Sequence, residues 1–230
     1  MIYVRSSVLP DAWEKSLVEL WRNGSLIMTE YDQVSIDSPA VIIVDSPLNE
    51  PRIHLKGCIA GLNGLRKYVE EILYGVESKW EYTYHERIFS YLPPVFKNDE
   101  VEVERLNQID YVVRKLKNAP YSRRAVVVIW QPWVDENTDY PPCLVYLWFR
   151  IINEKLEMHV HMRSNDALKA SFMNMYAYTE LQKYVADRLG CGVGRYVHVA
   201  DSYHVYERDW LWFEKFVEQV ESGESKKYWR

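Results

Sequence analysis

Residues 141–166 read PPCLVYLWFRIINEKLEMHVHMRSND, two apolar-rich runs joined by a polar pair. In the second run apolar and polar side chains alternate, which is the two-residue period of a β-strand with one buried face. We expect strands over 144–152 and 156–163. The Asn153-Glu154 pair between them favours a tight hairpin turn. The stretch therefore predicts two strands at the core of a sheet.

Outward from this hairpin, the sequence alternates between helical and strand patterns. Apolar residues at helical spacing predict helices over 12–21, 62–74, 101–116, 166–189 and 210–220, and short apolar runs predict strands within 38–45, 125–130 and 196–200. We expect an α+β fold in which helices cover a mixed, largely antiparallel sheet. Since no repeat, charge block or Gly/Ser linker interrupts the chain, we expect one domain over residues 1–230.

Composition excludes several classes of protein. Of the 230 residues 48% are hydrophobic and 27% charged, an ordinary globular balance, and 28 basic against 33 acidic side chains give a net charge of −5. This charge disfavours binding to duplex nucleic acid. The longest apolar runs are far shorter than the roughly 20 residues that span a bilayer, and no secretory signal is recognisable, so we expect a cytoplasmic protein with no membrane partner.

Three cysteines without CxxC spacing indicate neither a disulfide framework nor a zinc site, so we expect no metal. We interpret Cys58 and Cys191 as small buried apolar residues. Cys143 differs because two prolines precede it and hold the chain where a strand begins. It is a candidate nucleophile if Arg163, on the polar face of the neighbouring strand, lowers its pKa.

Other polar residues suggest a nucleotide site. Two arginines, Arg123 and Arg124, together with Arg163 and Ser164 have the donors that a phosphate needs, although an arginine pair is also common at a solvated strand edge. Asn174 both donates and accepts, as recognition of a pyrimidine requires, but could equally face solvent from its helix. His204 and Tyr206, two residues apart on an extended segment, could bind a sugar hydroxyl or serve structural hydrogen bonds.

The order of these residues is itself informative. The motifs are, in sequence, Arg123-Arg124, Pro141-Pro142-Cys143, Arg163-Ser164-Asn165-Asp166, Asn174 through Tyr178, and His204-Val205-Tyr206. This ordered set resembles the thymidylate synthase family, most strongly over residues 121–206, and Glu71-Ile72-Leu73-Tyr74 resembles the family's Glu-Leu-Leu-Trp helix. The length and the diverged N-terminal part are most similar to the short archaeal-type members.

The resemblance implies a role for each matched residue. Cys143 would add to C6 of the pyrimidine, Arg163 would bind the phosphate and favour the thiolate, and Asp166 would contact base and pterin. Glu71 would relay protons, and Tyr84 would help to remove the C5 proton. Nucleotide ligands would be Arg123, Arg124, Arg163, Ser164, Asn174, His204 and Tyr206, with the Arg123-Arg124 pair supplied by the other subunit of a sheet-to-sheet homodimer.

The implied activity is C5 methylation of dUMP to dTMP, with 5,10-methylenetetrahydrofolate or a modified tetrahydropterin such as methylenetetrahydromethanopterin as donor of carbon and hydride. One alternative is a dUMP or dCMP hydroxymethylase, in which water replaces hydride. A second alternative is a nucleotide- or RNA-binding protein that retains the fold without turnover.

The chain departs from the family pattern at several places. Where the family usually has a histidine after its catalytic cysteine, this chain has Leu144, and residues 169–174, KASFMN, replace the family's Leu-Gly-x-Pro-Phe-Asn. We therefore expect a reshaped pocket floor. No arginine-rich loop matches within 23–37, where Arg22 is the nearest candidate for a further phosphate ligand. We also expect no counterpart of the family's long C-terminal segment, which folds over the cofactor.

Overall fold

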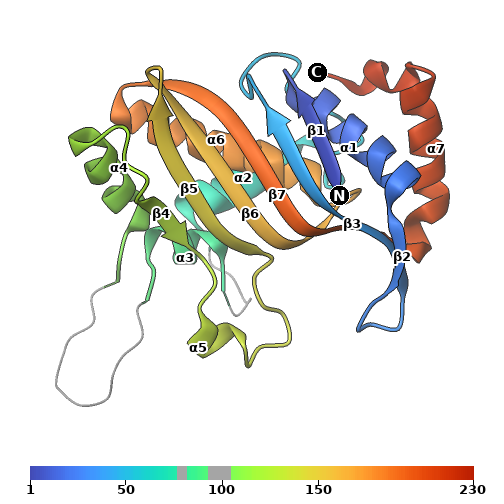
Figure 1. The fold of residues 1–230 in the computed structure, drawn as a ribbon, viewed down its shortest axis with the longest axis horizontal. Helices are drawn as coiled ribbons and strands as arrows, with labels where there is room; N and C mark the ends of the chain where they lie inside the picture. The colour runs from blue at the N-terminus through green and yellow to red at the C-terminus, as the bar shows by residue number, and fades with distance from the viewer. Residues whose placement is uncertain (77–81, 93–104) are drawn as a thin grey trace.

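A computed structural model describes residues 1–76, 82–92 and 105–230 (Figure 1). Its strands are β1 (Ile2–Ser6), β2 (Ser25–Met28), β3 (Val34–Val44), β4 (Ala125–Val128), β5 (Leu144–Ile152), β6 (Lys155–Asp166) and β7 (Gly192–Tyr206). They form one sheet in the order β1-β3-β7-β6-β5-β4, with β2 paired to β3. The β1/β3 and β6/β7 pairs are parallel and the others antiparallel, which confirms the expected mixed, largely antiparallel sheet.

The helices lie mainly on one face of this sheet. They are α1 (Leu9–Asn23), α2 (Gly61–Tyr74), α3 (Tyr84–Phe89), α4 (Gln108–Asn118), α5 (Pro132–Asp135), α6 (Ser171–Leu189) and α7 (Trp210–Glu221). Figure 1 shows α2 and α6 behind the sheet and α7 beside α1. In the parts of the chain that the structure describes, no helix combines the length and hydropathy needed to cross a membrane.

Alternation along the strands separates a core face from an open face. On β6, Met158 and Val160 are fully buried toward the helices, whereas His159 and His161 point the other way and are half-buried. On β5, the open-face residue Tyr146 stacks on His161 with ring centroids 5.0 Å apart. One side of the sheet therefore holds the hydrophobic core, and on the other no helix among the described residues covers the aromatic side chains.

The predicted hairpin between β5 and β6 is confirmed. Ile152 pairs with Lys155, so the loop contains only Asn153 and Glu154. Both have positive φ angles, 50° and 60° respectively. Two left-handed residues match the right-handed twist of the flanking strands, which is why two-residue hairpin loops take this form.

Two predicted helix starts were wrong. In the helix expected over 101–116, residues 101–104 lie outside the described residues. Leu106 forms a β-bridge with Tyr91 instead of helix. Helix α4 starts after Asn107, whose side chain accepts from the Asp110 N–H. The helix expected to begin at Asp166 begins at Ser171. The Asp166 carboxylate accepts the N–H groups of the next residues and forms a turn instead. Local side-chain hydrogen bonds thus override the apolar period.

The strand predicted over 196–200 is the middle of the 15-residue β7, which is lengthened by pairing with β3 on one side and β6 on the other. Strand β4 ends at Val128, two residues earlier than expected. Strands β1 and β2 and helix α3 were not predicted. They have only 5, 4 and 6 residues, too few for a periodic pattern to stand out.

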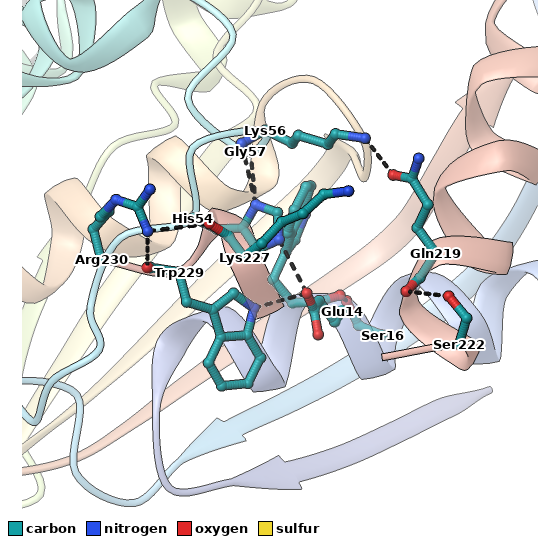
Figure 2. Close-up of polar contacts among 11 residues, drawn as sticks. Glu14, Ser16, His54, Lys56, Gly57, Gln219, Ser222, Lys227, Trp229 and Arg230 are labelled. Carbon is teal, nitrogen blue, oxygen red and sulfur yellow. Dashed lines mark hydrogen bonds and ion pairs between the residues drawn. The ribbon is translucent and has the colours of Figure 1, made fainter. Parts of the chain in front are cut away.

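The C-terminal residues are tied to the segment that leads into α2 (Figure 2). The buried Glu14 carboxylate accepts from Trp229 Nε1 at 2.8 Å and is 3.0 Å from His54 Nε2. On its other side, His54 Nδ1 accepts the N–H groups of Lys56 and Gly57. Because the Glu14 carboxylate is buried, the N–H groups of Trp229 and His54 replace the water that it has lost. In Figure 1 the C-terminus lies at the opposite end of the sheet from the β2–β3 turn.

The hairpin generates a stability prediction. A left-handed conformation costs a residue with a side chain about 1 kcal/mol, a cost that glycine does not bear. We expect Glu154→Gly to raise the free energy of unfolding by about 0.5 kcal/mol, since greater freedom of glycine in the unfolded chain offsets part of the relief. Urea unfolding measures this.

Glu218→Gly, in the exposed interior of α7, is the matched control and should lower the free energy of unfolding by about 1 kcal/mol. A loss of similar size in both variants would contradict the proposed strain at Glu154.

Candidate active site

A cavity of about 490 Å³ opens where β6 and β7 end and the β2–β3 turn approaches them. Its walls combine residues that are distant in sequence, from β3, α3, the loop before β5, the ends of β6 and β7, and the start of α6. The residues singled out from the sequence that line it are Tyr84, Cys143, Arg163, Ser164, Asp166, Asn174, His204 and Tyr206. The topology thus gathers a thiol, a guanidinium, an amide and several hydroxyl groups around one space.

Three predicted site residues are not among the described residues that line this cavity. Glu71 is half-buried on α2, and Arg123 and Arg124 are exposed immediately before β4. The main chain of the arginine pair is engaged, because the Arg123 carbonyl accepts from Trp148 Nε1 and the Arg124 carbonyl from the Tyr111 hydroxyl. Among the described residues the arginine that lines the cavity is Arg163.

Arg163 holds the chain on both sides of the thiol. Its Nε donates to the Pro142 carbonyl at 2.9 Å and its Nη2 to the Pro141 carbonyl at 2.8 Å. The Arg163 N–H also donates to the Cys143 carbonyl at 2.9 Å. A guanidinium has five N–H donors, so these two side-chain bonds leave the others for an anion in the cavity. Arg163 is therefore both a clamp on the cysteine loop and a candidate anion ligand.

The Cys143 thiol experiences two opposing effects. Burial raises its pKa above the ordinary value of 9.0, because a thiolate loses hydration there, while the positive charge of Arg163 lowers it. The larger effect is burial, so the net pKa is raised. Arg163 therefore lowers the pKa of Cys143, as expected from the sequence, but by less than burial raises it.

The helix that carries Tyr84 is anchored by a buried ion pair. Arg87 Nη2 lies 2.7 Å from Asp135 Oδ1, with Nη1 3.3 Å from Oδ2, which ties α3 to α5. The Tyr84 hydroxyl accepts the Leu144 N–H at 3.4 Å. Burial raises the pKa of Tyr84 well above 10, so its hydroxyl remains protonated at neutral pH.

His204 is oriented by residues that sequence reasoning missed. The Ser202 hydroxyl donates to the Asp37 carboxylate and lies 3.1 Å from His204 Nδ1. Since the hydroxyl proton is used by Asp37, the serine oxygen accepts from Nδ1–H. In the tautomer that this bond selects, Nε2 is an acceptor. An Nε2 acceptor suits a sugar hydroxyl. No motif links Asp37 to Ser202, which the β3–β7 pairing brings together.

The β2–β3 turn also contributes residues that the sequence did not single out. Thr29, Glu30 and Tyr31 line the cavity, in the region where no arginine-rich loop was found. Arg22 instead pairs with Glu221 at 2.6 Å on the exposed surface of α1 and is not among the described lining residues. The structure therefore does not bring Arg22 to the cavity.

The remaining cysteines behave largely as interpreted. Cys58 is 4% exposed, and burial raises its pKa to about 11. Cys191 packs partly buried against the core, and burial raises its pKa as well. Neither lines the cavity that contains Cys143. In the described residues no group of three or more His, Cys, Asp or Glu side chains could hold a metal ion.

Known proteins share this sequence pattern. The family model of thymidylate synthase matches residues 69–226. Proteins that carry the provisional name thymidylate synthase are 30% identical over 222 residues in Methanocaldococcus jannaschii, covering 94% of this chain and 96% of that protein, and 31% identical over 219 residues in Methanosarcina mazei, covering 94% and 95%. Thymidylate synthase 1 of Bacillus spizizenii is 32% identical over 130 residues, 56% of this chain and 47% of that protein.

The fold, the cavity and these similarities define the class: an enzyme that transfers one-carbon units. The chain belongs to the thymidylate synthase family, and its full-length similarity to the archaeal proteins fits the short archaeal-type members.

The opposing effects at Cys143 generate a prediction. Arg163→Ala should move the midpoint of Cys143 alkylation to higher pH, because removing the cation leaves burial unopposed. Iodoacetamide labelling across pH, read by peptide mass spectrometry at Cys143, measures the midpoint. Arg163→Lys retains a positive charge and should move it less. Superimposable profiles of wild type and Arg163→Ala would contradict this account.

Proposed function

We propose that this chain methylates C5 of dUMP to give dTMP, acting as one domain over residues 1–230 through a covalent bond between Cys143 Sγ and C6 of the pyrimidine. One observation supports this most strongly. The nucleophile Cys143, the anion ligand Arg163 and the amide of Asn174 line a single cavity. A nucleotide needs all three, since its phosphate, reacting ring and base edge must be held together.

The proposed nucleotide contacts follow the chemistry of the lining. Arg163 and Ser164 bind the phosphate through charge-assisted hydrogen bonds. His204 offers Nε2 as an acceptor for the 3′-hydroxyl, with Tyr206 beside it at a ring distance of 4.9 Å. Asn174 reads the uracil edge. The cavity thereby orients C6 toward the Cys143 thiol.

Covalent catalysis divides the reaction into easier steps. The Cys143 thiolate adds to C6, and the electron pair of the C5=C6 bond makes C5 an enolate-like nucleophile toward a one-carbon unit. After C5 has gained that unit and lost its proton, the bond between the new carbon and its carrier would break and a hydride would convert that carbon to a methyl group. Departure of the Cys143 sulfur from C6 then restores the ring double bond. Because burial raises the pKa of Cys143, the resting side chain is a thiol, and the charge of Arg163 stabilises the thiolate that adds to C6.

Proton transfer is assigned to Tyr84 and Glu71. The high pKa of Tyr84 makes it a neutral hydroxyl that orders water next to C5 rather than a strong base. Glu71 is half-buried and lies outside the lining, close enough to Tyr68 to influence its pKa. We propose that Glu71 acts through water, as the family resemblance implies.

The carbon and the hydride come from a methylene-tetrahydropterin, 5,10-methylenetetrahydrofolate or a modified pterin. The donor set of the cavity fits such a group at Asp166. Its Oδ1 accepts from the Leu168 and Lys169 N–H groups, which leaves Oδ2 as an acceptor for the N–H groups of a pterin. Asp166 would thus orient the pterin beside the pyrimidine.

The phosphate site is completed by a second copy of the chain in this proposal. The open face of the sheet carries aromatic side chains such as Tyr146 and Trp148, a surface suited to packing against another sheet. Arg123 and Arg124, exposed at the start of the outer strand β4, would then reach the partner's cavity. A homodimer would raise the number of arginines at each phosphate from one to three.

Trapping the covalent bond tests the proposal. Incubation with 5-fluoro-dUMP and a methylene-tetrahydropterin should add the mass of both ligands to the intact protein, because fluorine cannot leave C5 as a proton does. Cys143→Ala should abolish the adduct, and Cys191→Ala should retain it. A wild-type protein that forms no cysteine-dependent adduct with either pterin would support a binding protein instead.

With dUMP itself, the mass of the product separates the two proposed chemistries. A methyl group is expected at C5. A hydroxymethyl group would show that water takes the place of hydride and would contradict the methylation assigned here.

Base preference gives a further prediction. Asn174→Asp should shift nucleotide preference from dUMP toward dCMP, because a carboxylate accepts from the cytosine amino group and repels the uracil O4. We expect a change of at least tenfold in the ratio of the two dissociation constants, on the order of 1.4 kcal/mol, measured by competition. An unchanged ratio would contradict the role of Asn174.

A further inference from the structure

We propose that Tyr68 is a specificity-determining residue that fixes the orientation of the Asn174 amide and so selects uracil over cytosine. This inference rests on the proposed nucleotide function. It concerns a residue on α2, about a hundred positions from Asn174 in the sequence, that belongs to none of the motifs identified above.

A direct hydrogen bond carries the inference. The Tyr68 hydroxyl donates to Asn174 Oδ1 at 2.7 Å. Asn174 is 7% exposed and lines the cavity that contains Cys143. Its Nδ2 contacts only the Met162 sulfur, at 3.9 Å, within the described residues. Because a thioether is a weak acceptor, the N–H donors remain available to a ligand, while the strong bond is on the oxygen side.

The surroundings of Tyr68 keep its hydroxyl protonated, so that it can donate to the Asn174 oxygen. Burial raises its pKa well above the usual value for tyrosine, and the neighbouring Tyr84 and Tyr178 have raised pKa values for the same reason. All three phenols therefore keep their protons at neutral pH. If the Asn174 amide were reversed, its Nδ2 donor would face the Tyr68 O–H donor. To relieve this, the Tyr68 hydroxyl proton would have to turn toward another buried tyrosine.

The neighbouring position cannot take over this task. Leu144 follows the candidate nucleophile where the family usually has a histidine, and it is fully buried in the hydrophobic core. Its side chain has no polar atom. In this chain the polar group that fixes the amide beside the cysteine is thus supplied from α2 by Tyr68.

An amide fixed in this way matches one base. The carbonyl oxygen has a second lone pair that can accept from N3–H, and Nδ2 can donate to O4, which is the pattern of uracil. Cytosine has an acceptor at N3 and an amino donor at C4, so it requires the reversed amide. Tyr68 therefore favours uracil without touching the nucleotide, and we regard it as a positioning residue.

The test compares dUMP and dCMP in Tyr68→Phe. A neutral hydrogen bond of about 1 kcal/mol corresponds to about fivefold in affinity, so the preference for dUMP over dCMP should fall by about fivefold. In the Asn174→Asp background the same substitution should leave the ratio unchanged, because a carboxylate has no reversed orientation. This double-mutant cycle separates orientation of the amide from a general structural role.

Tyr196→Phe is the matched control. It removes another buried phenol hydroxyl, bonded to His198 Nδ1 at 2.9 Å and not to Asn174, and should leave the preference unchanged. Equal preference in wild type and Tyr68→Phe, with dUMP still bound, would overturn this inference alone. Failure of the wild-type protein to bind either nucleotide would overturn the proposed function and this inference with it.

A measurement on the wild-type protein covers the case in which Tyr68→Phe does not fold. With 15N-labelled protein, saturation with dUMP should move the Asn174 side-chain N–H resonances downfield because they donate to O4. Saturation with dCMP should not, since the fixed amide finds no acceptor at C4. Equal shifts with both nucleotides would overturn the inference.

Discussion

The site depends on the attachment of the Arg163 guanidinium to the two proline carbonyls that precede Cys143. Antiparallel pairing of β5 with β6 places Leu144 opposite Met162, so the residues one step beyond, Cys143 and Arg163, face each other across the strand ends. The bonds from Arg163 to Pro141 and Pro142 then fix the loop. A cation held so close to a buried thiol offsets part of the cost of forming a thiolate there, which an apolar neighbour could not do.

Around this contact the fold arranges the rest of the site through elements that are rigid for independent reasons. The buried Arg87–Asp135 pair anchors the helix that carries Tyr84. The Asp166 turn ends β6 at the cavity and starts α6, which presents Asn174 one turn later. Because each element is fixed by its own hydrogen bonds, the polar groups lining the cavity are preorganised before a ligand arrives. The C-terminal residues are anchored to Glu14 at another part of the fold.

Local sequence patterns were sufficient for the β5–β6 hairpin, because period-two alternation and the Asn153-Glu154 turn both act over neighbouring residues. They also located Cys143 and Arg163 correctly relative to each other. Contacts between distant segments could not be read this way: Asp37 with Ser202, Tyr68 with Asn174 and Trp229 with Glu14 join residues that share no motif. Glu71, Arg123 and Arg124 were assigned by resemblance. The described lining of the cavity does not include them, so their roles stay predictions.

The central claim is that a nucleophilic thiol and a guanidinium share one nucleotide-binding cavity. A crystal structure of the protein with 5-fluoro-dUMP and a methylene-tetrahydropterin tests it most directly. The account predicts continuous density between Cys143 Sγ and C6, with the phosphate against Arg163 and Ser164. A nucleotide bound elsewhere, or one whose phosphate points away from Arg163 while C6 lies out of reach of the sulfur, would contradict it.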